Sequence, residues 1–334
     1  MLKLVGWLVL LSGPVRSAAQ PVVIDGRWAR YIRPPVLEPL VDGVSLLVPP
    51  ELEDRRLAAL GFVDVTKAPF GADPTGRRDS TLAIQRAINF ARDHQMVCLF
   101  PTGTYLVSDT LSCIQGLYRR SNGRVLGDRL GPCLLAGSRS GPRPKIVLAP
   151  HSPGYDDPSR PKYVVHFWAR GCGRGVSPVP PDRPQPNISM NQMFVNIDIV
   201  IGEGNPGAVA IRHRAAQGSG VQDCRIEVRN GLTGLEGGAG SGGSHANITI
   251  IGGQIGMDLR QTQPAPTITG ITLIGQSKAA IIYAGRQALC AVGLKIVATT
   301  TGPVIRAEPA KWTPHNGQMC IIDSQIICRK PQTT

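Results

Sequence analysis

The 334-residue sequence lacks several features that would place it in common functional classes. Beyond its first residues, no stretch approaches the ~18 consecutive apolar residues of a transmembrane helix. No group of Cys and His residues has the spacing of a structural zinc site, and there is no glycine-rich phosphate loop or nucleophile elbow. The sequence therefore predicts a protein with no membrane partner, no metal site and no cofactor.

The first 19 residues have the pattern of a secretory signal. Lys3 supplies positive charge, and the apolar run from Leu4 to Leu11 is too short to span a membrane. Small residues at 17–19 offer a cleavage site before Gln20. We therefore expect a secreted or periplasmic protein, and a retained N-terminal anchor is the alternative.

Acidic residues are scarce relative to basic ones, and the formal net charge is +13. The excess is local, because residues 116–175 hold eleven Lys and Arg against three acids. This stretch is either a solvated Arg-rich loop or a surface that attracts an acidic polysaccharide. Aromatic residues are not interleaved with the charges and no nucleic-acid motif is present, so nucleic acid is not an expected partner.

The eight cysteines allow a disulfide framework in an exported chain. Cys98 and Cys224 occupy apolar strand positions, which predicts small buried hydrophobes rather than disulfides. Better candidates for disulfide bonds lie in expected loops or beside the last strand: Cys113, Cys133, Cys172, Cys320 and Cys328.

A repeat of about two dozen residues runs through the second half of the chain. One apolar series has spacings of 27, 24, 23 and 23 residues, and its members are Ile199, Ile226, Ile250, Leu273 and Ile296. A second series has spacings of 24, 22, 24 and 24 residues, and its members are Ile211, Leu235, Met257, Ile281 and Ile305. Short, alternating, β-branched segments with one period predict stacked coils that share a continuous core. An antiparallel β-sandwich is the alternative, but it would not keep the period so constant.

The fold class predicted is all-β, a single right-handed parallel β-helix over residues 61–334 with long loops at 116–190. An irregular leader over residues 20–60 precedes it and includes a short polar helix near Glu51 to Leu60. Apolar residues at 84, 87, 88 and 91 have helical spacing and predict an amphipathic helix over 80–94. We expect this helix to cover the N-terminal end of the core.

Several motifs resemble a known superfamily. The run from Gly71 to Gly76, the segment from Asp79 to Ile88, and Pro101-x-Gly103-x-Tyr105 resemble the start of pectate-lyase-like, rhamnogalacturonase/epimerase-type β-helices. The later runs are similar to the first β-helix of family 55 exo-β-1,3-glucanases: Asn205 to Ile211, Ala216 to Gly218, Gly240 to Gly243 and Gly252-Gly253. The resemblance implies an extracellular protein with a carbohydrate ligand.

The resemblance to the glucanases departs at one point. Those enzymes carry a second β-helix that contributes the catalytic acid, whereas this chain ends at Thr334. No catalytic residue is therefore transferred from them. The chain is therefore expected to be either a shortened relative of these enzymes or one half of such an architecture. A second β-helix half or a second copy of the chain is accordingly a partner to consider.

The repeat also predicts which residues lie side by side on the outer surface. The residues that follow the second core series are Arg212, Glu236, Asp258, Ile282 and Arg306. Side chains alternate along a strand, and neighbouring strands lie ~4.8 Å apart, so Glu236 and Asp258 should be adjacent with Arg212 beside them. We name Glu236 and Asp258 as catalytic candidates. Substrate-binding candidates nearby are Arg212, Arg214, Arg260 and Tyr283.

A carboxylate pair in which one group holds a proton is typical of glycoside hydrolases, and a polysaccharide hydrolase is the leading functional hypothesis. β-Elimination on a uronate is an alternative, in which the arginines neutralise the substrate and Tyr283 or His213 acts as base. A carbohydrate-binding β-helix without turnover is a third hypothesis. The structural alternative is a ladder of ion pairs, Arg212–Glu236 and Asp258–Arg260, that only supports the solenoid.

Overall fold

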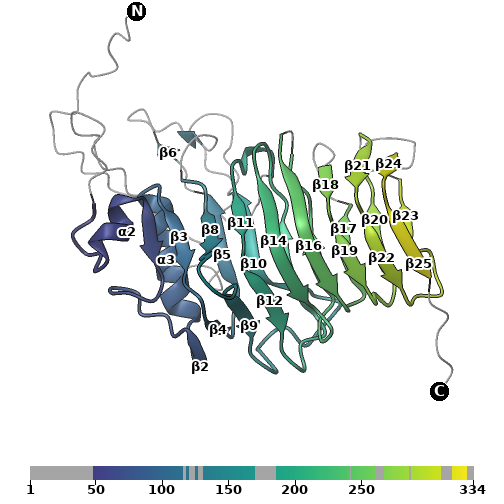
Figure 1. Ribbon diagram of the computed structural model, residues 1–334. Helices are drawn as coiled ribbons and strands as arrows, with labels where there is room; N and C mark the ends of the chain where they lie inside the picture. The colour runs from purple at the N-terminus through teal and green to yellow at the C-terminus, as the bar shows by residue number, and fades with distance from the viewer. Residues whose placement is uncertain are drawn as a thin grey trace, which may run out of the picture.

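Core residues that the repeat predicts as neighbours lie opposite one another on adjacent parallel strands in the computed structural model. The structure describes residues 48–115, 118–119, 125–126, 131–169, 186–240, 242–260, 267–285, 287–309 and 318–328. Six core residues predicted from the repeat are at most 1 % exposed: Ile226, Ile250, Leu273, Leu235, Met257 and Ile281. The strands around residues 248 and 271 are parallel, since Ile250 pairs with Leu273, and this excludes the antiparallel alternative. The chain is a parallel β-helix whose coils stack from one end of the molecule to the other (Figure 1).

The strands belong to two large parallel sheets and one small antiparallel pair. The larger sheet, sheet A, contains β1 Phe62–Asp64, β2 Thr75–Asp79, β3 Val97–Phe100, β4 Thr104–Val107, β8 Leu134–Gly137, β9 Lys145–Leu148, β11 Met193–Val195, β12 Asp198–Ile201, β14 Gly220–Glu227, β16 Ser244–Ile251, β18 Thr267–Thr269, β19 Thr272–Ile274, β21 Leu289–Val292, β22 Lys295–Ala298, β24 Met319–Ile322 and β25 Gln325–Cys328. The smaller one, sheet B, contains β5 Leu111–Gln115, β10 Lys162–Ala169, β13 Ala208–His213, β15 Thr233–Glu236, β17 Ile255–Leu259, β20 Ala279–Tyr283 and β23 Ile305–Ala307. The antiparallel pair is β6 Tyr118–Arg119 with β7 Val125–Leu126. Within the described residues, the helical segments are α2 Arg55–Ala59, α3 Thr81–Asp93 and the 3₁₀ turn η1 Pro186–Ile188.

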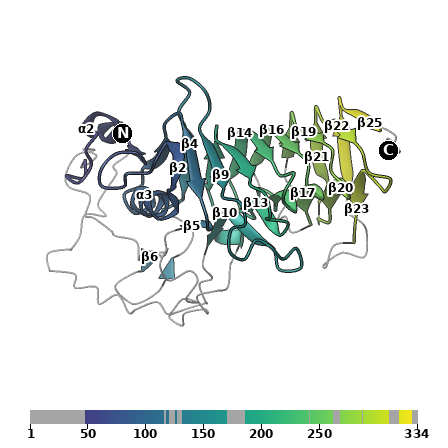
Figure 2. The ribbon, with the colours of Figure 1, turned by 90° about the horizontal axis from the view of Figure 1, so that it is seen from below.

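Each later coil bends within sheet A at one residue with positive φ. The first five of these residues recur at the repeat spacing, the sixth follows after a longer interval, and all are Asn, Asp or Gly: Asn196, Asp223, Asn247, Gly270, Gly293 and Asp323. Asn, Asp and Gly tolerate the left-handed conformation best, because a short polar side chain bonds locally and glycine has no Cβ. In β14 and β16 this bend lies inside one continuous strand, whereas in the next coil it separates β18 from β19. The bend turns the chain so that two rows of sheet A face sheet B across the core (Figure 2).

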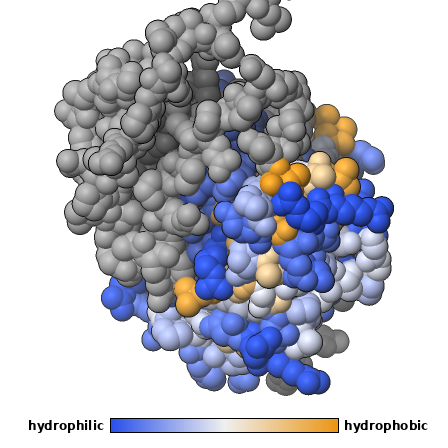
Figure 3. Space-filling model, turned by 90° about the vertical axis from the view of Figure 1, so that its left-hand side faces the viewer, coloured by the Kyte–Doolittle hydropathy of each residue, from blue (hydrophilic) through white to orange (hydrophobic). Residues whose placement is uncertain are grey.

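Helix α3 covers the N-terminal end of the core, as its apolar spacing predicts. Ile84, Ala87 and Ile88 are at most 1 % exposed and belong to the same apolar core as the strands. The Gln85 side chain also pairs with the backbone of Ser112 in β5, donating to its carbonyl at 2.8 Å and accepting from its N–H at 2.7 Å. These bonds satisfy the backbone of the outermost strand of sheet B, which would otherwise be an open sheet edge. The described surface at this end is mostly hydrophilic (Figure 3).

The last described coil is exposed although it keeps the core pattern. Ile326 lies opposite Ile296 in register, yet it is 46 % exposed, whereas Ile296 is fully buried. Ile321 is 41 % exposed, although its register partner Ala291 is buried. No helix within the described ranges is long and apolar enough to cross a membrane.

Cysteine burial agrees with one part of the sequence analysis and corrects another. Cys98 and Cys224 are buried hydrophobes, as predicted. The predicted disulfide candidates among the described residues are free thiols, and one of the two described cysteines expected in loops lies in a strand instead. Cys113 lies in β5 and Cys133 directly before β8, and both are buried. Cys172, the signal segment 1–19 and the first part of the leader lie outside the described residues.

Candidate functional site

The outer face of sheet B carries the row of residues predicted from the repeat. Arg212 of β13 lies opposite Glu236 of β15, and Glu236 lies opposite Asp258 of β17. The row continues through Ile282 to Arg306. The predicted position of Glu236 and Asp258 opposite one another on adjacent strands is therefore confirmed, and a catalytic role for them stays a prediction.

Every carboxylate of this surface contacts a guanidinium. Arg212 Nη1 contacts Glu236 Oε1 directly. Arg260 donates to both oxygens of Asp258, through Nε at 2.9 Å and Nη2 at 2.5 Å. Glu308 lies 2.7 Å from Arg306 and 3.8 Å from Arg260. We call this set of residues the Arg–carboxylate row, and its pairing is what a ladder of structural ion pairs would also show.

The two central carboxylates are shielded from water. Glu236 and Asp258 side chains are 18 % and 13 % exposed, and that of Arg260 is 44 % exposed. Burial raises the pKa of Glu236 above its ordinary value, and the charge of Asp258 raises it further, against the opposing effect of Arg212. Arg260 binds Asp258 through two hydrogen bonds, whereas Arg212 contacts Glu236 through Nη1. The two acids therefore differ in environment, and the raised pKa of Glu236 favours its protonated form.

Arg214 lies close to this pair. It is half-buried, and burial followed by the charge of Arg212 lowers its pKa. Its charge also opposes the rise in the pKa of Glu236. The structure thus brings Arg212, Arg214 and Arg260 together around the two carboxylates, as predicted.

Tyr283 and His213 are corrections to the sequence analysis, because both side chains point into the core. Tyr283 lies opposite Leu259, is fully buried, and donates its hydroxyl hydrogen to the carbonyl of Gln287. His213 is also fully buried and lies 3.0 Å from the carbonyl of Gln192. Neither side chain faces the Arg–carboxylate row, so neither can contact a substrate bound there.

Strand β10 adds ring side chains that the sequence analysis missed. His166 lies opposite Arg212, one strand further along the row. Its ring stacks on Trp168 with ring centroids 5.9 Å apart and is tilted against Tyr163 with ring centroids 4.8 Å apart. The Tyr163 hydroxyl accepts a hydrogen bond from Arg212 Nη1 at 2.6 Å, and the guanidinium lies 4.9 Å from the centre of its ring. Burial, followed by the charge of Arg212, holds the pKa of His166 well below its usual range. His166 and Trp168 are buried, and Trp168 donates its indole N–H to Ser112, so of these rings only Tyr163 is partly exposed beside the paired charges.

The repeat could have located these rings, but an insertion hides them. Val165 of β10 lies opposite Ile211 in the second core series, although 46 residues separate them. This separation is about twice the repeat, so the constant period does not extend to β10. Within the part of the chain that the structure describes, no group of three or more His, Cys, Asp or Glu side chains is arranged to hold a metal ion.

Comparison with protein families gives a partial match at the N-terminal end. Residues 62–133 match the family described as rhamnogalacturonase A/epimerase, pectate lyase-like. The match covers the stretch from which the superfamily resemblance was drawn, and the parallel β-helix agrees with it. The finer likeness to family 55 glucanases has no support from the comparisons. No curated protein matches the sequence.

Solved structures similar to this chain are remote in sequence. PfbA, a surface protein and adhesin of Streptococcus pneumoniae, is 13 % identical, with 80 % of this chain and 78 % of that one covered and a TM-score of 0.44. ORF18 of Geobacillus virus E2 is 14 % identical, with 82 % and 60 % covered and a TM-score of 0.35. The family GH82 iota-carrageenase of A. fortis is 12 % identical, with 72 % and 55 % covered and a TM-score of 0.30. No function is transferred from likenesses this distant.

Proposed function

We propose that this protein is an exported glycoside hydrolase that acts on a polysaccharide along the outer face of sheet B. Glu236 is the proton donor and Asp258 the second carboxylate. The observation that carries the proposal is their position opposite one another on adjacent strands in unlike surroundings. The family match at residues 62–133 and the signal-like first 19 residues support a carbohydrate substrate and export.

The proposed reaction uses the difference between the two acids. Protonated Glu236 donates its proton to the glycosidic oxygen as the bond from that oxygen to the sugar ring breaks. Ionised Asp258, held by Arg260, can attack the anomeric carbon and form a glycosyl-enzyme ester, which water then hydrolyses as Glu236 takes the proton of that water. Alternatively, Asp258 removes a proton from a water that attacks the anomeric carbon directly. Carboxyl groups ~5–5.5 Å apart suit the first course, which retains configuration, and ~6.5–9.5 Å suits the second, which inverts it.

Binding without turnover is the second candidate. It is favoured by the contact of each carboxylate of the row with an arginine, because such pairing stabilises the ionised form of Glu236. The half-buried ring of Tyr163, which accepts a hydrogen bond from Arg212, would serve a binding protein equally well. β-Elimination loses support, because its two predicted bases lie in the core.

Neutral and acidic polysaccharides such as β-glucan, pectin and alginate provide the test. A hydrolase releases reducing ends without an unsaturated product, a lyase releases a product that absorbs in the ultraviolet, and a binding protein releases neither. In the variant Glu236→Gln we expect turnover to fall ~100-fold or more while the fold is preserved, since a general acid is removed.

Glu227→Gln is the matched control for this variant. Glu227 lies in β14 of sheet A and is also ion-paired, with Arg225 at 2.9 Å. Its replacement should leave turnover unchanged. If Glu236→Gln keeps full turnover and only lowers the melting temperature, the Arg–carboxylate row is structural and the hydrolase proposal is wrong.

A further inference from the structure

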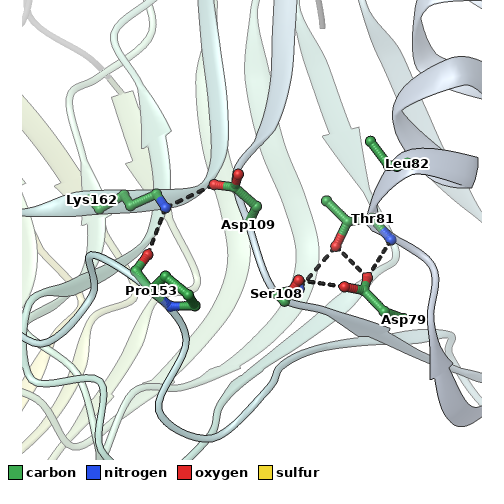
Figure 4. A pocket seen from close by; sticks show the side chains of 7 residues that line it. All are labelled: Asp79, Thr81, Leu82, Ser108, Asp109, Pro153 and Lys162. Carbon is green, nitrogen blue, oxygen red and sulfur yellow. Dashed lines mark hydrogen bonds and ion pairs between the residues drawn. The ribbon is translucent and has the colours of Figure 1, made fainter. Parts of the chain in front are cut away.

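A cavity of about 360 Å³ lies at the N-terminal coil, apart from the Arg–carboxylate row (Figure 4). Three parts of the chain line it: the end of β2 with the first turn of α3, the turn between β4 and β5, and the beginning of β10 with the loop before it. Its lining residues are Asp79, Thr81, Leu82, Ser108, Asp109, Pro153 and Lys162. This volume is near the lower end of the ~300–1,000 Å³ of small-molecule sites.

Hydrogen bonds between lining residues hold the polar groups of the cavity in place. Asp79 Oδ1 accepts from the backbone N–H of Thr81 at 2.7 Å and from its hydroxyl at 2.5 Å. Asp79 Oδ2 accepts a hydrogen bond from the Ser108 hydroxyl. Lys162 Nζ lies 2.8 Å from Asp109 Oδ1 and donates to the Pro153 carbonyl at 2.8 Å. Acceptors and donors are therefore arranged around the cavity before any ligand arrives (Figure 4).

The charges of the cavity select the class of ligand. Two carboxylates and one ammonium line it, so its formal charge is negative and a uronate would be repelled. Carboxylate oxygens accept hydrogen bonds from sugar hydroxyls, and the lysine donates them. Leu82 is 54 % exposed at the cavity, which offers an apolar wall to the C–H face of a sugar ring.

The cavity is linked to the proposed active site through β10. Lys162 directly precedes Tyr163, which bonds Arg212 of the row. Lys162 lies four residues before His166, and two strand spacings separate His166 from Glu236. Strand geometry then puts the Cα atoms of Lys162 and Glu236 roughly 16 Å apart. A chain of several sugars could contact both places, whereas a monosaccharide could contact only one.

We propose that this cavity is a subsite that binds one neutral sugar residue of the polysaccharide. The proposal rests on the proposed function and adds a substrate class to it, because it assigns a neutral rather than an acidic residue to this end of the site. The subsite strengthens the binding of long oligosaccharides and takes no part in bond cleavage.

The test compares Leu82→Ala and Lys162→Met with wild type, using titration calorimetry and turnover on neutral oligosaccharides of increasing length. We expect each variant to bind long oligosaccharides roughly fivefold or more weakly, with KM raised and kcat kept. Short oligosaccharides should show no change. Leu60→Ala is the matched control, because Leu60 is 65 % exposed and does not line the cavity. Circular dichroism melting checks that Leu82→Ala keeps the fold.

The outcomes separate the two proposals. If wild type binds and cleaves a polysaccharide but both variants match it at every length, the subsite is refuted and the proposed function stands. If long uronate oligomers lose affinity in the variants and neutral ones do not, the neutral class is wrong. If wild type neither binds nor cleaves any member of the panel, the proposed function fails and the subsite fails with it.

Discussion

Replacing Leu273 by Ala tests the stacking of the coils most directly. Leu273 is fully buried and lies in register between Ile250 and Ile296. A Cβ placed on Gly256 would lie 3.1 Å from Leu273 Cδ2, so the leucine fills its space up to the backbone of sheet B. Hydrogen-bonded strands on both sides limit how far the site can collapse. The lost burial and the remaining cavity should therefore cost about 2–5 kcal/mol of the free energy of unfolding.

Ile326→Ala is the control for this prediction, because it removes a similar side chain from the same series. Ile326 is 46 % exposed, so its truncation should cost less than about 1 kcal/mol. Urea unfolding followed by circular dichroism measures both losses, provided that the slope with denaturant is unchanged. A loss below about 1 kcal/mol for Leu273→Ala, or one no larger than for Ile326→Ala, would refute the register.

Two further predictions concern the interior. Burial lowers the pKa of His213 to about 4 and that of His245 to about 3. Below the ordinary histidine pKa of 6.5 the unfolded chain therefore binds more protons than the folded one, and stability falls as pH falls. Denaturant unfolding at pH 7 and pH 5 should differ by about 2 kcal/mol for each histidine, and equal stability at both pH values would contradict their burial as neutral groups. Gly234→Ala places a Cβ 2.4 Å from Ile250 Cγ2, which should destabilise by about 1–3 kcal/mol. Gly302→Ala, with 3.6 Å to its nearest neighbour, should be nearly neutral in the same assay.

The sequence by itself determined the coil register. A constant period with alternating apolar residues leaves one arrangement in which every coil buries its apolar side, and a slip of one residue would turn Leu235 or Met257 outward. The register in turn places Glu236 beside Asp258, because outward residues of stacked coils are neighbours. Helix α3 was predictable for the same reason, since its apolar face has no other surface to cover.

Only the tertiary structure decided the positions and surroundings of residues that the repeat does not predict. An insertion between β10 and β13 hides the rings of Tyr163 and His166, although they lie beside Arg212. The inward position of Tyr283 follows from alternation along β20, in which Ile281 also faces the core, and not from the coil in which it lies. Burial sets the environment of Glu236, and burial depends on packing between coils rather than on the order of residues.

The cavity at the N-terminal coil also depends on the tertiary structure. Asp79, Ser108 and Lys162 are far apart in sequence and belong to no shared repeat, so only the path of the folded chain brings them together. The period of a solenoid determines which residues of successive coils are neighbours. Contacts between its insertions, its cap and its corners depend on the lengths and courses of individual turns, and these appear only when the chain is folded.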